Sequence, residues 1–171
     1  MSDGDQRTLD LLRRLDRMPG PHHMEFPDGF DYNRAEARAG KLSERLTREF
    51  GFPCPVSPAQ DASSYFSMGI DAQATEAGGH LGIRLSNYGD LASITTPARG
   101  GLNDDLHGDL DEAVAEGAIS QADRIRVETA LSDLGYVLVQ QRPLQRRYDG
   151  VHTDWVWAGE PTWWVRFFYY L

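Results

Sequence analysis

Residues 81–96 read Leu81-Gly82-Ile83-Arg84-Leu85-Ser86-Asn87-Tyr88-Gly89-Asp90-Leu91-Ala92-Ser93-Ile94-Thr95-Thr96. Over 81–86, large apolar side chains alternate with small or polar ones, which is typical of a strand with one buried face. Ser, Asn, Gly and Asp gather in 86–90 and predict a turn. Residues 91–96 return to apolar and β-branched side chains, so they predict a second strand, antiparallel to the first.

The same kind of pattern identifies further strands. In 65–70 every second side chain is large and apolar, so this segment is expected to precede the pair in an antiparallel meander. Residues 136–139 form a continuous apolar run, which predicts a short strand in the centre of the sheet. The last predicted strand is 162–170, the second arm of a hairpin that turns at 158–161.

Four segments are expected to be helical. Apolar side chains recur at steps of three and four in 5–18 and in the segment from Asp31 to Phe50. Two more helices are expected to begin at Asp109 and Ser120, whose side-chain oxygens can cap free backbone N–H groups. Glycines stand where the last two helices would end.

The order of these elements indicates one fold class. Strands are grouped and do not alternate with helices. We therefore predict an α+β fold, with a mostly antiparallel sheet of five or six strands and helices packed on one face. The length of 171 residues suits one globular domain, which we expect to span 1–171.

The net charge of −9 is concentrated in one region. Residues 103–133 contain nine acidic side chains and two basic ones, whereas 1–50 and 142–171 are nearly neutral. This acidity disfavours nucleic acid as a partner, because binding to phosphates needs an excess of Lys and Arg. It would attract a basic protein and speed the association.

We predict that a basic protein partner binds this acidic segment. The predicted contact residues are Asp104, Asp105, Asp109, Asp111, Glu112 and Glu116. The alternative is a solvated surface that keeps the protein soluble. In 103–111 polar side chains stand at every second position, as in a calcium-binding loop, but Val114 occupies the position where such a loop needs Glu. We therefore interpret the acidic residues as the start of a helix.

No catalytic residue, cofactor or metal site is predicted. The five His residues lack the spacing of metal ligands. The motifs of serine hydrolases, phosphate-binding loops and dinucleotide-binding folds are absent. Cys54 lies between two prolines, with no His or cation beside it in the sequence, so we expect an inert, buried thiol.

The location is inferred from composition. No apolar run approaches the roughly 20 residues that span a bilayer, and residues 1–5 do not resemble the start of a signal peptide. A lone cysteine excludes an intramolecular disulfide. We expect a cytoplasmic protein without membrane contact. The single Lys among 17 basic residues is compatible with GC-rich, bacterial coding.

A second candidate surface comes from strand alternation. If the large apolar residues of the meander face the helices, the opposite face is polar and uncovered by any predicted helix. Its residues include Tyr65, His80, Arg84 and Ser86. We expect either a solvated sheet face or a shallow binding surface, and a cleft around His80 and Arg84 is the basis of an enzyme alternative.

Aromatic residues gather at the end of the chain. The last 17 residues contain 8 of the 18 aromatic side chains and all four Trp. On a strand, both faces of this segment would be aromatic, which fits a covered strand or a surface exposed for recognition. We expect mainly core, with a small-ligand or glycan platform as the alternative.

These observations favour a small acidic, non-catalytic protein-binding module. In size, acidity and lack of a catalytic motif the chain resembles bacterial immunity proteins that neutralise cationic toxins. The resemblance lies in composition, so it assigns no role to any residue. The alternatives are an enzyme of unrecognised type and a small-ligand or glycan binder that uses the aromatic end.

Overall fold

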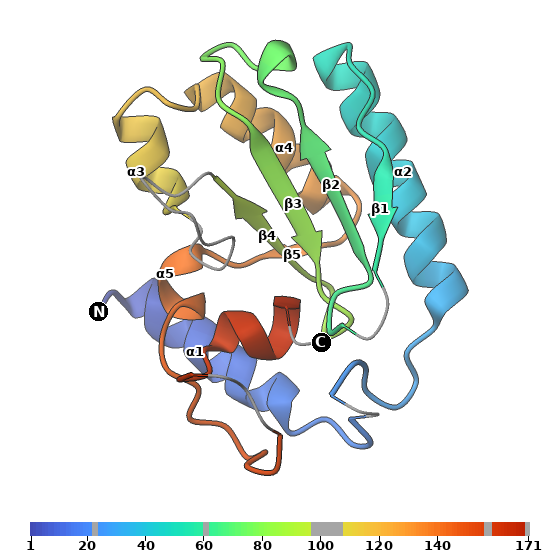
Figure 1. The fold of residues 1–171 in the computed structure, drawn as a ribbon, viewed down its shortest axis with the longest axis vertical. Coiled ribbons are helices and arrows are strands. Elements are labelled where there is room, and N and C mark those ends of the chain that lie inside the picture. Colours follow the sequence, from blue (N-terminus) through green and yellow to red (C-terminus); the bar gives the residue numbers. More distant parts are fainter. Residues whose placement is uncertain (22–23, 60–61, 97–107, 156–158, 170–171) are drawn as a thin grey trace.

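A computed structural model describes residues 1–21, 24–59, 62–96, 108–155 and 159–169 (Figure 1). Its elements, in chain order, are α1 (Asp3–Asp16), α2 (Tyr32–Phe50), β1 (Val56–Pro58), β2 (Phe66–Ile70), η1 (Ala72–Ala74), β3 (Leu81–Leu85), β4 (Leu91–Thr95), α3 (Leu110–Ala115), α4 (Gln121–Asp133), β5 (Val137–Leu138), α5 (Gln141–Leu144) and η2 (Val165–Tyr169). The fold is α+β, with a five-stranded, mostly antiparallel sheet, which confirms the predicted class.

The sheet has the strand order β1-β2-β3-β4-β5. The meander of β2, β3 and β4 is antiparallel as predicted, and its register places Ile83 between Met68 and Ile94. β1 forms one edge and was not anticipated from the sequence. β5 pairs only with β4, in parallel, so it is the other edge.

The prediction that 136–139 lies centrally in the sheet is wrong. Val137 is 44% exposed, and among the described strands β5 has a neighbour on one side only. Side chains of this apolar run belong instead to two separate hydrophobic clusters. Tyr136 packs into the cluster beside α2 and α4, and Val139 packs into the cluster beside α1.

One face of the sheet packs against α2 and α4. Leu42 and Leu46 from α2, together with Val127 and Leu131 from α4, are fully buried against the apolar side chains of β2 and β3. The predicted helix starts are confirmed, since Asp31, Asp109 and Ser120 each accept a hydrogen bond from a backbone N–H in the first turn.

The predicted C-terminal hairpin is wrong, because the segment is helical. Four aromatic side chains, Trp163, Trp164, Phe167 and Phe168, are almost completely buried. Trp163 stacks on Phe167 with ring centroids 5.8 Å apart, and Trp164 stacks on Phe168 at 5.2 Å. These are i,i+4 pairs, which meet on a helix and not on a strand. Both aromatic faces are thereby covered, one of them beside α1 (Figure 1).

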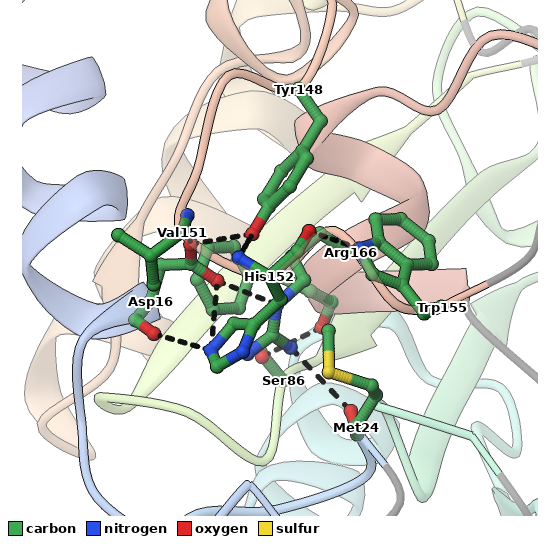
Figure 2. A network of polar contacts seen from close by, with 9 residues as sticks. Asp16, Met24, Ser86, Tyr148, Val151, His152, Trp155 and Arg166 are labelled. Atoms are coloured by element: carbon green, nitrogen blue, oxygen red, sulfur yellow. Dashed lines mark hydrogen bonds and ion pairs between the residues drawn. The ribbon is translucent and has the colours of Figure 1, made fainter.

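A buried ion pair joins the first helix to this last segment. Asp16, at the end of α1, is 1% exposed, and Arg166 is fully buried. The Nε atom of Arg166 donates to Asp16 Oδ1 at 2.7 Å. The other carboxylate oxygen accepts hydrogen bonds from the Tyr148 hydroxyl at 2.6 Å and the Val151 backbone N–H at 2.9 Å (Figure 2). The buried charge is therefore both paired and hydrogen-bonded, as a desolvated carboxylate requires.

The loop from 148 to 155 closes around this pair. The His152 backbone N–H donates to the Tyr148 hydroxyl, and the His152 ring Nε2 lies 2.9 Å from the backbone oxygen of Asp16. The indole N–H of Trp155 donates to the His152 carbonyl. A Cβ on Gly150 would lie 2.1 Å from an Asp16 oxygen, so this position has no room for a side chain.

The guanidinium of Arg166 makes further contacts. It lies over the rings of Tyr88 and Phe167, with centroid distances of 4.5 and 4.8 Å. Its Nη1 atom is 3.5 Å from the carbonyl oxygen of Met24. The ion pair consequently connects α1, the loop before α2, the turn between β3 and β4, and the C-terminal segment.

We predict that Asp16→Asn strongly destabilises the protein. The substitution keeps the shape of the side chain but leaves the Arg166 charge buried without a counter-charge, which typically costs about 3–5 kcal/mol. Urea unfolding followed by far-UV circular dichroism measures the change in the free energy of unfolding.

The matched control is Asp149→Asn. Asp149 forms an ion pair with Arg13 at 2.7 Å, but both side chains are at least one-third exposed. Loss of such a surface pair costs less than about 1 kcal/mol. Equal effects of the two substitutions would contradict the central role of the buried pair.

Candidate functional site

The second surface predicted from strand alternation is not assembled as expected. Tyr65 packs on the side of Phe26 and Phe30 and belongs to the cluster with α2. His80 is exposed, at the start of β3 and beside Gly69. The structure therefore does not place Tyr65 on the face that carries Arg84.

The expectation of an uncovered polar face is wrong for Arg84 and Ser86. Arg84 Nη1 donates to the Phe168 carbonyl at 3.0 Å, and Ser86 Oγ donates to the Phe167 carbonyl at 2.7 Å. The Arg84 guanidinium also lies 5.4 Å from the ring centroid of Tyr169. The last carbonyls of a helical segment lack partners within it, and these two side chains satisfy them. Their role here is to fasten the C-terminal segment to the sheet.

The aromatic end is likewise occupied by packing. The rings of Trp163 and Trp164 are 0% and 1% exposed. Trp155 is half-buried, and Trp157 lies outside the described residues. A glycan platform needs exposed rings, so Trp163 and Trp164 cannot supply one without leaving the core.

A hollow of about 430 Å³ lies beside α3. We call it the acidic hollow, and its lining residues are Gly79, Thr96, Gly108, Asp109, Glu112, Ala113, Glu116, Gly117, Ala118 and Ile119. Three of the six predicted contact residues are among them, and of the lining residues that the structure describes none is basic. Ala113 and Ile119 are buried and supply an apolar floor.

Local sequence explains why these acids share one side. Asp109 caps α3, because its Oδ1 atom accepts from the backbone N–H groups of Asp111 and Glu112 at 2.8 and 3.3 Å. Residues three and seven positions after Asp109 return to the same side of a helix. Glu112 and Glu116 therefore follow Asp109 along the hollow, and Gly117 ends the helix with a φ of 75°.

The other predicted acids have different surroundings. Asp111 forms an ion pair with Arg124 at 2.6 Å, so its charge is already compensated. Asp104 and Asp105 lie outside the described residues. Asp109 Oδ2 is 3.5 Å from Nη2 of Arg142, which is 62% exposed. Such an exposed contact is weak and screened.

One contributor to the hollow was not anticipated from the sequence. Gly79 comes close to the segment that follows α3, since a Cβ built on it would lie 2.2 Å from the Ala118 carbonyl oxygen. Nearby, the buried Asp123 accepts from the Glu76 backbone N–H at 2.7 Å, which fixes the loop before β3 to α4. The role of Gly79 carries no local signal, because it depends on a contact between segments far apart in sequence.

Other reactive groups do not form a site. Burial raises the pKa of the Cys54 thiol, and its Sγ atom contacts the Phe52 carbonyl at 3.4 Å. Within the described ranges, His, Cys, Asp and Glu side chains form no group of three that could hold a metal ion. In the same part of the chain, no helix combines the length and the apolar character needed to cross a membrane.

The chain matches no known family model, no curated protein and no solved structure. An inference about function therefore depends on the chemistry of the residues themselves.

We predict that Cys54 reacts slowly with iodoacetamide in the folded protein at pH 8. The thiolate is the reacting form, and burial disfavours it by raising the thiol pKa. The rate of alkylation, followed by mass spectrometry, should be well below that of N-acetylcysteine and should rise to that value in 8 M urea. Equal rates in the folded and unfolded protein would refute the inert assignment.

Proposed function

We propose that the protein is a small acidic, non-catalytic binding module that receives a basic protein at the acidic hollow. One observation carries this proposal. Asp109, Glu112 and Glu116 line a single hollow that has an apolar floor, and none of its described lining residues is basic. The proposal extends to an immunity-type role in which the partner is a cationic bacterial toxin, and to action in the cytoplasm.

The lining of the hollow suits the side chain of Lys or Arg. Such a side chain has an apolar stem and a charged head. The stem can pack on Ala113 and Ile119, while the head donates hydrogen bonds to the carboxylate of Glu112. Ion pairs of this type raise the rate of association and select a basic partner over an acidic one.

The surrounding charge supports the same partner. The chain carries −9, and its acids are densest in the segment that contains α3 and α4. A field of one sign over a surface increases the local concentration of oppositely charged molecules. This long-range attraction is screened by salt, so association with the partner should slow as the ionic strength rises.

We predict that the double substitution Glu112→Lys and Glu116→Lys abolishes capture of the basic partner. Both side chains are exposed, and Glu116 caps the end of α3 through its backbone N–H, which the substitution retains, so the fold should persist. Placing like charges against a basic partner should lower its recovery by about 10-fold or more. Affinity capture from an extract of the source cells, with quantitative mass spectrometry, measures the recovery.

The matched control is the double substitution Glu36→Lys and Glu160→Lys. These exposed residues lie outside the acidic hollow, and the change in net charge is identical. A basic protein recovered by the control but lost by the α3 variant supports the proposal. Equal recovery by both variants, or equal loss from both, would refute a site at the acidic hollow.

A further inference from the structure

A second hollow, of about 470 Å³, lies between the loop that precedes α2 and the edge strand β1. We call it the aromatic hollow, and its lining residues are Glu25, Phe26, Phe30, Tyr32, Pro58, Ala59 and Tyr65. Its volume lies in the range of about 300–1,000 Å³ that is usual for small-ligand sites. None of its lining residues belongs to the acidic hollow.

Four aromatic rings form most of the lining, with Tyr65 in the middle. The Tyr65 ring centroid lies 5.8 Å from Phe30, 5.8 Å from Tyr32 and 6.3 Å from Phe26. The rings meet Tyr65 at interplanar angles of 54–61° and do not form one stack. Phe26 and Phe30 stack on each other with centroids 5.5 Å apart, whereas both are inclined to Tyr65, so the rings of the hollow lie in more than one plane.

The ring with the greatest access to solvent is Tyr32. It is 44% exposed, although it is a large aromatic residue. It occupies the first position of α2, where the capping contact is made by Asp31 and not by Tyr32. Helix formation therefore leaves this ring available for a ligand.

The charge of the aromatic hollow is negative. Among the described residues that line it, Glu25 alone is charged. Its Oε2 atom accepts a hydrogen bond from the Tyr65 hydroxyl, which holds the carboxylate beside the rings. Within the part of the chain that the structure describes, no Lys, Arg or His forms an ion pair with Glu25.

We propose that the aromatic hollow binds an organic ammonium ion, with preference for a methylated nitrogen. Aromatic faces attract cations through the ring quadrupole, and this attraction strengthens when the cation sheds water easily. Methyl groups reduce hydration of the nitrogen and add apolar surface that the rings can bury. The Glu25 carboxylate supplies the counter-charge.

The lining also disfavours other classes of ligand. An anion would be repelled by Glu25, and the lining residues within the described ranges offer it no basic side chain. A neutral sugar needs several hydrogen-bonding groups in addition to a ring, and the Glu25 and Tyr65 side chains are already bonded to each other. Positive charge together with apolar surface is thus the combination that the lining selects.

The test is isothermal titration calorimetry of the intact protein with choline, with the amide of N-acetyl-trimethyllysine, and with 3,3-dimethylbutan-1-ol. The alcohol has the shape of choline but no charge. We expect saturable binding of at least one ammonium ligand, at least about 10-fold tighter than binding of the alcohol. Tighter binding of choline would indicate a free small cation, and tighter binding of the lysine derivative a modified protein side chain.

Two substitutions locate the binding. Tyr32→Leu removes the exposed ring, and Glu25→Gln removes the charge while keeping an oxygen that can accept from Tyr65. Each should weaken ammonium binding by about 10-fold. The matched control is Glu36→Gln, which removes one exposed carboxylate on α2 outside the hollow and should leave the affinity unchanged.

The proposal is overturned if no ammonium ligand binds saturably, if the alcohol binds as tightly as choline, or if both substitutions leave the affinity unchanged. It does not rest on the acidic hollow. The Glu112→Lys and Glu116→Lys variant should retain ammonium binding, so failure of one proposal can be distinguished from failure of the other.

Discussion

The carboxylate of Asp16 is the constraint on which the two ends of the molecule depend. It is buried, so it requires a cation and hydrogen-bond donors in fixed positions. Arg166, Tyr148 and the backbone of Val151 supply them. The C-terminal segment that carries Arg166 is in turn fastened to the sheet, because Arg84 and Ser86 donate hydrogen bonds to two of its carbonyls. A polar contact thus sets where a mainly aromatic segment packs, whereas apolar burial alone would leave its direction open.

The two hollows differ in how many carboxylates and how much apolar surface line them. At the acidic hollow, several carboxylates surround a small apolar floor, which suits a strongly hydrated Lys or a forked Arg head. At the aromatic hollow, one carboxylate accompanies four rings, which suits a weakly hydrated cation. Net charge alone does not separate these cases. The amount of apolar surface around each carboxylate distinguishes them, because a weakly hydrated cation gives up its water to aromatic rings at a lower cost in free energy than a strongly hydrated one.

The sequence was sufficient where one periodicity dominated. Alternation around Ile83 and the capping oxygens of Asp109 and Ser120 predicted the meander and the helix starts correctly. It was insufficient from Trp163 to Phe168, because side chains that are apolar on every side fit a covered strand and a covered helix equally. The deciding contact, with Asp16, is distant in sequence. Helical spacing predicts that Asp109 and Glu112 lie on the same side of α3. The hollow itself also depends on Gly79, whose backbone comes close to Ala118 from a distant part of the sequence.

The Asp16–Arg166 pair spans 150 residues, and this separation has a consequence for synthesis of the protein on the ribosome. The cluster formed by α2, α4 and the sheet face lies within residues 39–136 and can pack as soon as that segment has emerged. The cluster around α1 contains Leu9 and Leu12 but also Phe167 and Phe168, so it can close only when the final segment arrives. During synthesis, the N-terminal domains of a chain commonly fold first. Within this domain, the first helix can reach Arg166 only after the final segment has been synthesised, so its carboxylate stays in water until then.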